Sequence, residues 1–330
     1  RGPIGPTPER SRGQWDKTPY QSRTGERKIA ALEEFGGTVE TERAVELGLE
    51  YLASRQRQDG RWGRRDRDEK YGEMMIGKTG LAVLAFMGAG HTAASGSRYS
   101  KVVERGLLFL VDQQDDETGH IGSCSSYGHA IATYALGEAY ALTKDERLRR
   151  TLENAVQQIV DNQLASRDPL LDGGWSYFYP SGRRFDRWPR ASVTAWQVMA
   201  LESAKLGGVS VPKHVFDRAR SFLVNCWDPS RGAFRYSHDP SRLRSDYDIL
   251  PGSTPASMFA LSLLGGDLTQ DQFGPARRFV LERAPSGYRY TGDDDFVFRA
   301  RGNLYFWYYG TLAMFRVGGD EWERWNVAMK

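Results

Sequence analysis

Acidic and imidazole side chains are the groups of this chain that could transfer a proton. Asp293, Asp294 and Asp295 are consecutive, and clustered carboxylates raise one another's pKa, so that one of them could stay protonated and act as an acid. Glu138 lies in an apolar stretch, where burial would raise a carboxyl pKa in the same direction. His129 lies in that stretch too, and an imidazole titrates near neutral pH. These five residues are the weak catalytic candidates of the sequence.

Each candidate can also be explained by a purely structural role, and we favour that explanation. The three aspartates follow Gly292 and are predicted to form a solvated acidic loop. His129 is interpreted as a hydrogen-bonded histidine of the core, and Glu138 as a buried or rim carboxylate that pairs with a basic group or a tyrosine. The chain contains neither a Gly-x-Ser-x-Gly nor a His-Glu-x-x-His motif. The sequence therefore contains groups that could donate a proton, but no arrangement of residues that defines a catalytic site.

Residues that could bind a metal ion come close together twice, but neither group predicts a site. Cys226, Asp228 and His238 fall in a linker between predicted helices, and Cys124 with His129 offers only two ligands. Zinc sites in proteins need three or four ligands in a tetrahedral arrangement. We therefore predict no metal ion and no other cofactor. Two cysteines also cannot build a disulfide framework.

The composition excludes several classes of protein. The 330 residues are 40% hydrophobic, 26% charged and 12% aromatic, which is typical of a globular chain with ample material for a core. The net charge of +3 is too small to indicate nucleic acid as a partner. No apolar run reaches the roughly 18 residues of a transmembrane segment. The chain begins at Arg1 without the apolar stretch of a signal peptide, as expected of a processed or excised piece, and no compartment is indicated.

A glycine followed by a hydrophobic residue recurs along the chain and indicates which elements must position these groups. The hydrophobic positions are Trp62, Ile121, Trp175, Phe234 and Tyr288. They are separated by 59, 54, 59 and 54 residues. A near-fixed period of this length indicates one supersecondary unit that is repeated along the chain.

Each repeated unit is predicted to be a pair of helices joined by the glycine loop. The first helix of a pair has one charged face, whereas the second is apolar almost all round and is therefore buried. The predicted pairs are 40–55 with 74–87, 99–113 with 127–142, 146–163 with 192–206, 212–225 with 255–264, and 269–282 with 304–316.

Amphipathic outer helices around apolar inner helices predict an all-α fold, an (α/α) toroid of about five to six helical hairpin repeats. A short helix at 27–35 and a last helix from Glu321 would meet and close the ring. Residues 1–24 are predicted to form an irregular N-terminal arm, because they are rich in Pro, Gly and Arg and lack periodicity. Residues 25–330 are predicted to form a single toroid domain.

The segment from Gln56 to Trp62, with the sequence QRQDGRW, resembles the QW repeat of squalene and oxidosqualene cyclases, which protein prenyltransferase β subunits carry in diverged form. Looser copies are Gln114 with Gly119, and Gln163 with Gly173 and Trp175. The resemblance covers about residues 38–320 and is strongest to the short bacterial prenyltransferase/squalene-oxidase repeat proteins. It implies an (α/α) toroid with inner helices around a central cavity.

The catalytic residues of the resembled families are missing from this chain. The cyclases use an Asp-x-Asp-Asp motif on an inner helix, whereas Asp293–Asp295 has another spacing and precedes its inner helix. The zinc ligands of the prenyltransferases are also absent at the heads of the inner helices. The motif itself has a structural explanation, since Gln can bond the free carbonyls at a helix end and Gly permits a tight reversal.

The resemblance places function in the central cavity, at the N-terminal ends of the inner helices, which are electropositive and have free N–H groups. The predicted cavity-lining residues are Lys78, Tyr127, His129, Ser192, Trp196, Thr254, Tyr305, Trp307 and Tyr308. Aromatic faces can stabilise cations. Packing between the inner helices is the interpretation of these residues that we favour.

Three functions are compatible with this sequence. We favour a binding module that holds an apolar or isoprenoid-like small molecule, or a protein segment, in its cavity without converting it. The alternatives are a diverged isoprenoid cyclase or prenyltransferase-like enzyme, and a structural scaffold within a longer protein. An open apolar tunnel would favour ligand binding, whereas a centre filled by Trp196, Tyr305 and Trp307 would favour the scaffold.

Overall fold

The computed structural model describes residues 20–64, 74–180, 186–243, 248–287 and 292–330. The described part begins with a 3-10 helix, η2 (Gln21–Arg23), and helix α1 (Gly25–Phe35). Most of the predicted N-terminal arm, residues 1–19, lies outside the described residues, and so does Tyr288.

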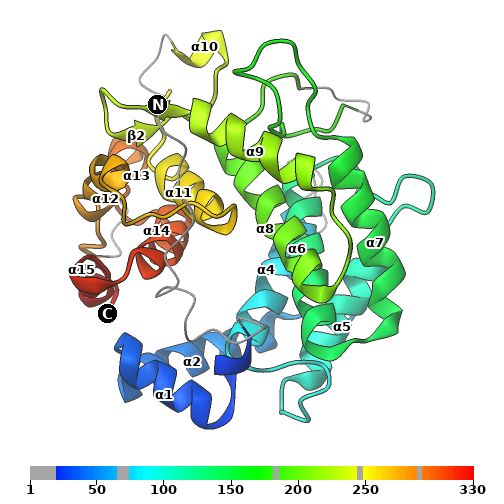
Figure 1. The fold of residues 1–330 in the computed structure, drawn as a ribbon. Coiled ribbons are helices and arrows are strands. Elements are labelled where there is room, and N and C mark those ends of the chain that lie inside the picture. The colour runs from blue at the N-terminus through cyan, green and yellow to red at the C-terminus, as the bar shows by residue number, and fades with distance from the viewer. Residues whose placement is uncertain (1–19, 65–73, 181–185, 244–247, 288–291) are drawn as a thin grey trace.

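Ten helices of the described chain alternate between an outer and an inner layer, as predicted (Figure 1). The outer helices are α2 (Val39–Arg55), α5 (Ser100–Asp112), α7 (Glu146–Asp161), α9 (Lys213–Asn225) and α12 (Gly274–Leu281). The inner helices are α4 (Met74–Gly88), α6 (Ser126–Thr143), α8 (Ala191–Gly207), α11 (Ser253–Leu263) and α14 (Leu304–Val317). Their bounds lie within a few residues of the predicted ones, except at the start of α12.

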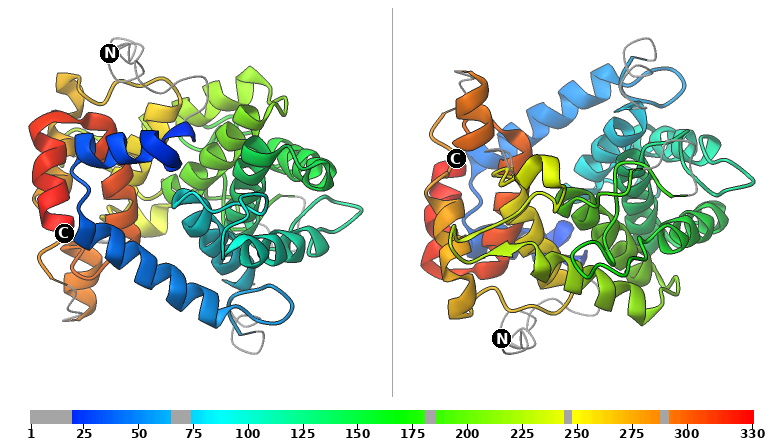
Figure 2. Two further views of the ribbon diagram at one scale, coloured as in Figure 1. Left: turned by 90° about the horizontal axis from the view of Figure 1, so that it is seen from below. Right: turned by 90° about the horizontal axis from the view of Figure 1, so that it is seen from above.

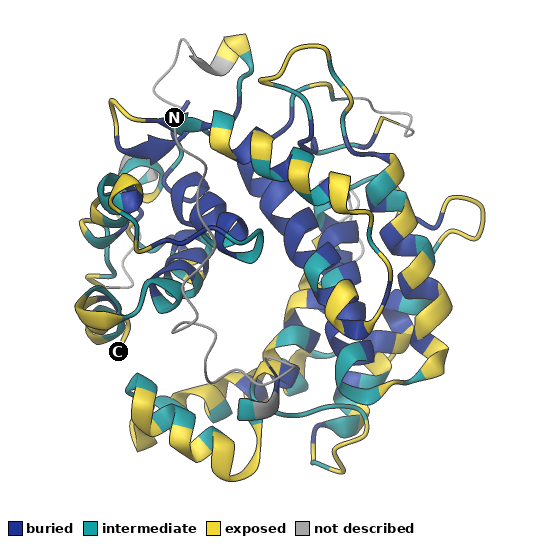
Figure 3. Ribbon diagram, viewed as in Figure 1, coloured by how far each residue is buried: buried dark blue, intermediate teal, exposed yellow. Residues whose placement is uncertain are grey.

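The two layers follow from the distribution of apolar residues. Helices α6 and α8 are buried along almost their whole length, and Figure 3 shows them as the dark interior of the molecule. Helix α7 buries one face only, through residues such as Leu148, Leu152 and Ile159. Asp145 caps its first turn by accepting a hydrogen bond from the N–H of Arg147 at 3.1 Å. The charged residues of α7 lie on its exposed side.

The inner helices pack in the order α4, α6, α8, α11 and α14, each against the next. The chain ends with α15 (Gly319–Met329), which packs against α14 and α12. The ring closes where α1 reaches these last helices (Figure 2). Asn326 donates a hydrogen bond to the carbonyl of Phe35 at 3.0 Å, and the rings of Phe35 and Phe315 meet edge to face at 4.8 Å. The predicted (α/α) toroid is confirmed.

The remaining described elements are short. Strands β1 (Trp227–Asp228) and β2 (Ala233–Phe234) form an antiparallel pair in which Trp227 lies opposite Phe234. Helices α10 (Pro240–Leu243), η4 (Asp271–Phe273) and α13 (Asp293–Phe298) lie in the connections. The prediction of an acidic loop at 293–295 was wrong, because these residues begin α13. Acidic residues in a first helical turn complement the partial positive charge of its N–H groups.

The Gln and Gly of the repeated motif tie each unit to the next outer helix. The side-chain amide of Gln56 donates to the carbonyls of Gly60 at 3.0 Å and of Val102 at 2.8 Å. Its counterparts Gln114 and Gln163 repeat this pair of contacts. Gln114 bonds Gly119 and Thr151, and Gln163 bonds Gly173 and Val215, all at 2.9 Å. The motif therefore sets the spacing of neighbouring units. None of the described helices is both long and apolar enough to cross a membrane.

Candidate functional site

Aromatic and hydroxyl side chains gather at the N-terminal ends of the inner helices. Trp196 stacks on Tyr308 with ring centroids 5.7 Å apart, and the hydroxyls of Tyr127, Ser192 and Tyr305 lie next to one another. Burial raises the pKa of Tyr127 and Tyr305 well above the usual value, so both phenols stay neutral. The structure thus brings together five of the predicted cavity-lining residues, of which Trp196 and Ser192 are buried whereas the three tyrosines stay partly exposed.

Three other predicted lining residues lie elsewhere. Lys78 is exposed on α4. Thr254 is fully buried and accepts a hydrogen bond from the backbone N–H of Phe234 at 3.0 Å. Trp307 is half-buried and lines a separate hollow with Arg283.

His129, the last of the predicted lining residues, uses both ring nitrogens in structural hydrogen bonds. Its Nδ1 accepts from the N–H of Ile121 at 2.9 Å, and its Nε2 lies 3.0 Å from the carbonyl of Ala155, to which it donates as the neutral tautomer. Burial first, and the neighbouring imidazole of His120 second, lower the pKa of His129 well below its usual range. The ring stays neutral and has no nitrogen left for a substrate.

The contact of His129 belongs to a series that recurs in the four units whose motif residue the structure describes. The N–H of Trp62 donates to Thr79 at 3.0 Å, and the N–H of Trp175 donates to Thr194 at 3.1 Å. In the fourth unit, Thr254 accepts the corresponding hydrogen bond from the N–H of Phe234. In all four units, an acceptor near the start of the inner helix binds the backbone of the motif's hydrophobic residue. His129 thus takes the place that threonine has in the other units.

The neutral state of His129 makes the stability of the fold depend on pH. Because its folded-state pKa lies below the ordinary value of about 6.5, the unfolded chain binds a proton first as the pH falls. The contribution of a neutral buried histidine to the free energy of unfolding is fully present above that pH. Below it, the free energy of unfolding should fall by up to about 1.4 kcal/mol per pH unit for each such histidine. Burial lowers the pKa of His91 and His238 in the same direction.

Urea unfolding at pH 7.5, 6.5 and 5.5 measures this dependence. His129→Gln should reduce the loss of stability between pH 6.5 and 5.5, whereas His214→Gln, at an exposed position of α9, should leave it unchanged. An equal loss in His129→Gln and in the original protein would contradict the assignment.

Glu138 of α6 is buried in an ion pair with Arg23 of η2. Its side chain is 1% exposed, and its two oxygens accept from Nη1 and Nη2 of Arg23 at 2.5 and 3.3 Å. The same Nη1 lies 3.4 Å from the carbonyl of Met87, and the guanidinium covers the ring of Tyr20 at 4.7 Å. Burial and, to a lesser extent, Glu138 raise the pKa of Tyr20 to about 12. The interpretation of Glu138 as a buried carboxylate with a basic partner is confirmed.

The aspartate cluster lies outside the inner layer, on α13. The carboxylate of Asp295 pairs with Arg299 at 3.4 Å and with Arg301 at 3.5 Å. The side chains of Asp293 and Asp294 lie outside the described part. The structure therefore does not bring the aspartates together with Glu138 or His129.

Among the described residues, no cluster of three or more His, Cys, Asp or Glu side chains has the arrangement of a metal site. Asp228 pairs with Arg235 at 2.5 Å. Burial raises the pKa of the neighbouring Cys226 thiol to about 12, so this thiol stays protonated and unreactive.

The two cysteines should consequently react at very different rates. Cys226 is fully buried, whereas Cys124 is partly exposed. Titration of the folded protein with Ellman's reagent at pH 8 should release one equivalent quickly, and a second only after unfolding in guanidinium chloride. Cys124→Ser should remove the fast phase. Two fast equivalents in the folded protein would show that Cys226 is accessible.

An apolar concavity lies where the ring closes, and we call it the seam groove. It has a volume of about 770 Å³ between α1, α2, α4 and α14. Its lining is Ser22, Arg23, Lys28, Ala31, Leu32, Phe35, Glu42, Val45, Gly48, Leu49, Tyr51, Leu52, Ala85, Gly88, Ala89 and Phe315. The ion pair of Lys28 with Glu42, at 2.8 Å, belongs to this lining. The groove can hold a small molecule of moderate size.

The seam groove was not predicted from the sequence. Val45, Leu49 and Leu52 recur at helical spacing within residues 40–55 of the sequence, and all three line the groove. Val45 and Tyr51 keep 44% and 59% of their surfaces exposed. The sequence therefore contained the apolar face of α2, but the spacing of its residues did not indicate that part of this face stays exposed.

The fold and the repeated contacts define the class of this protein as an (α/α) toroid of helical hairpins. A scan against protein-family models found no match, and a search of curated proteins found none either. Among solved structures, the chain is similar to cellobiose 2-epimerase from Bacillus thermoamylovorans B4167, with a TM-score of 0.48 and 10% sequence identity. The match covers 63% of this chain and 59% of the epimerase, so the chain spans less than two thirds of that protein.

Proposed function

We propose that this protein is a binding module, similar to the squalene cyclase-like repeat proteins, that holds an apolar or amphipathic small molecule in the seam groove. The observation that carries the proposal is the apolar lining of a groove of about 770 Å³ that keeps large side chains exposed. Exposed apolar surface costs about 25 cal/mol per Å² relative to buried surface. A ligand such as an isoprenoid or fatty acyl chain would recover this free energy.

Two glycines of the groove support the same proposal. Gly48 lies in the interior of α2, where glycine costs about 1 kcal/mol relative to alanine. A Cβ atom added to Gly48 or to Gly88 would meet no atom within 4 Å. Packing therefore does not require glycine at either position. A bound molecule that occupies this space would explain why side chains are missing there.

The positions of the acidic candidates favour binding without conversion. Glu138 is engaged by Arg23, both nitrogens of His129 are bonded, and Asp295 is shared by two arginines. A diverged isoprenoid cyclase or prenyltransferase-like enzyme would need a free proton donor or a metal site. The second candidate is a structural scaffold, because Trp196, Tyr305 and their neighbours pack at one end of the ring.

Solvent extraction of the purified protein, followed by mass spectrometry, tests the proposal first. We expect a stoichiometric apolar molecule or, for empty protein, saturable binding of a fluorescent fatty-acid analogue that farnesol displaces. Gly48→Trp would fill the groove and should weaken this binding at least about tenfold, equivalent to about 1.4 kcal/mol.

Ala30→Trp is the matched control, since Ala30 is exposed on α1 outside the groove lining. It should bind the fatty-acid analogue as the original protein does. An empty extract, together with no saturable binding by the folded protein, would refute the proposal and favour the scaffold. Equal loss of binding in both tryptophan variants would place the ligand elsewhere.

A further inference from the structure

A second concave surface, far richer in arginine, lies around the end of α12. It consists of two adjoining hollows of about 340 and 690 Å³ that share Glu282, Arg283 and Phe298. We call the two hollows together the arginine groove. Its arginines are Arg231, Arg278, Arg283, Arg299 and Arg301, and Glu282 is the one carboxylate among the residues that line it. None of these arginines lines the seam groove.

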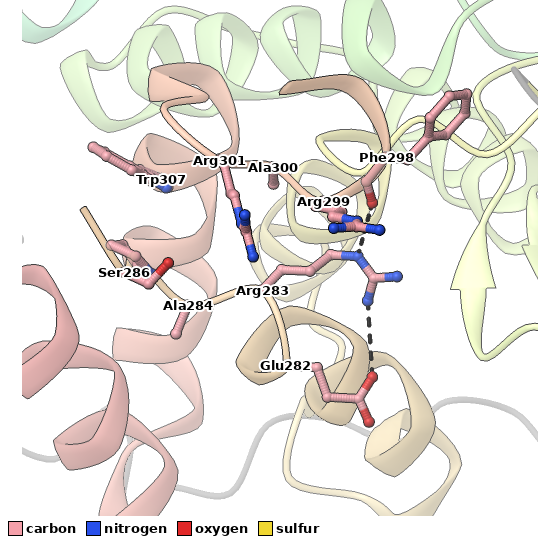
Figure 4. Close-up of a pocket in the computed structure, with 10 residues that line it drawn as sticks. Glu282, Arg283, Ala284, Ser286, Phe298, Arg299, Ala300, Arg301 and Trp307 are labelled. Carbon is pink, nitrogen blue, oxygen red and sulfur yellow. Dashed lines mark hydrogen bonds and ion pairs between the residues drawn. The ribbon is translucent and has the colours of Figure 1, made fainter. Parts of the chain in front are cut away.

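Arg283, at the junction of the hollows, is held in place mainly by neutral groups. Its Nε donates to the carbonyl of Phe298 at 3.3 Å and its Nη1 to that of Phe279 at 3.0 Å. The guanidinium lies 3.7 Å from the centre of the Phe279 ring. Glu282 is 3.8 Å from Nη1 (Figure 4), and burial outweighs this carboxylate, so the pKa of Arg283 is lowered. The cation is thus fixed but incompletely neutralised.

The other arginines carry a surplus of positive charge. Arg299 and Arg301 are 69% and 49% exposed and share the single carboxylate of Asp295. Arg278 is exposed on α12, and no ion pair joins it to another described residue. Only Arg231 has a close partner, Asp248 at 2.6 Å, a carboxylate that also pairs with Arg235. The described carboxylates therefore leave Arg278 without an ion pair, and Arg299 and Arg301 with one carboxylate between them.

The distribution of these charges indicates the class of ligand. The arginines are spread over two hollows that also have apolar side chains in their linings, Phe279 and Ile249 in the larger hollow and Trp307 in the smaller one. Guanidinium groups bind carboxylates through paired hydrogen bonds. A peptide that alternates carboxylates with apolar side chains would match both features. Nucleic acid fits less well, because the net charge of the whole chain is only +3.

We propose that the arginine groove binds an acidic segment of a partner protein. The probe is a fluorescein-labelled twelve-residue peptide in which glutamates alternate with leucine and phenylalanine, followed by fluorescence anisotropy. We expect saturable binding that weakens with added salt, because exposed ion pairs are screened. The same peptide with every glutamate replaced by glutamine should not bind.

Charge reversal at two exposed positions tests the site itself. Arg278→Glu with Arg301→Glu should weaken binding of the acidic peptide at least about tenfold. Lys213→Glu makes the same kind of change at an exposed position of α9 and should leave binding unchanged. Circular dichroism and a thermal melt check that the variants remain folded.

Three results would overturn the proposal. Equal binding of the glutamine peptide would show that only apolar contacts act. A phosphate-buffered sample in which inorganic phosphate binds through Arg278 and Arg301, while the peptide does not, would reduce the groove to a small-anion site. Tighter binding of a single-stranded oligonucleotide than of the peptide would indicate nucleic acid as the partner.

Discussion

Replacing Arg23 with methionine is expected to lower the free energy of unfolding by about 3–5 kcal/mol, the usual consequence of leaving a buried charge without its partner. Glu138 is 1% exposed, so water cannot take over the role of the guanidinium. Methionine keeps much of the length of the arginine side chain. The loss in the free energy of unfolding therefore reports the missing positive charge more than missing packing contacts. Urea unfolding followed by circular dichroism gives the difference.

A double variant separates the unpaired charge from the net contribution of the ion pair. Arg23→Met with Glu138→Leu should recover most of the loss, because well-packed apolar residues often replace a buried pair without destabilisation. Arg149→Met, which breaks an exposed pair with Glu153 on α7, should cost no more than about 0.5 kcal/mol. If Arg23→Met costs as little as Arg149→Met, the buried pair does not hold the N-terminal segment in place.

Gly173→Ala is expected to lower the free energy of unfolding by about 3 kcal/mol or more, from left-handed backbone strain and lost hydrogen bonds. Gly173 has a φ of +87°, and a Cβ atom there would overlap the carbonyl oxygen of Arg218 on α9. Moving α9 away would also stretch the hydrogen bond from Gln163 to Val215. Gly60, with a φ of +92°, is in the same relation to Arg105, so Gly60→Ala should have a similar effect.

Gly48→Ala provides the matched control, because the same substitution is made inside a helix and next to open space. It should raise the free energy of unfolding by about 0.5–1 kcal/mol, since alanine is the better helix former. Opposite signs for Gly173→Ala and Gly48→Ala are the expected result of the urea experiments. Loss of stability at Gly48 as large as at Gly173 would show that the close approach of neighbouring units is not the cause.

The fold could be predicted because its repeated contacts are short in sequence. Each motif glycine touches the outer helix of the next unit, so the spacing of the motif reports the length of one unit directly. The apolar inner helices also differ plainly from the charged outer ones. His129 could have been understood in the same way, because Thr79, Thr194 and Thr254 occupy its position in other units.

The candidate sites were less predictable because they depend on distant segments. Arg23 and Glu138 are 115 residues apart, and no local pattern relates them. The seam groove is lined by helices from both ends of the chain, α1 and α2 on the N-terminal side and α14 on the C-terminal side, and the spacing of apolar residues within one helix does not indicate such a neighbour. The aspartates were predicted to form a loop, but Phe296 and the residues around it extend them into a six-residue helix.

Closure of the ring has a consequence for the order in which the molecule folds and opens. Phe35 and Asn326 are 291 residues apart, so their contact closes a loop of nearly the whole described chain and should form after the units have assembled. Amide hydrogens of α1 and α15 should exchange quickly, and those of α6 and α8 slowly. Each opening of the seam would uncover the apolar groove, so the proposed apolar ligand would enter where the two ends of the chain meet.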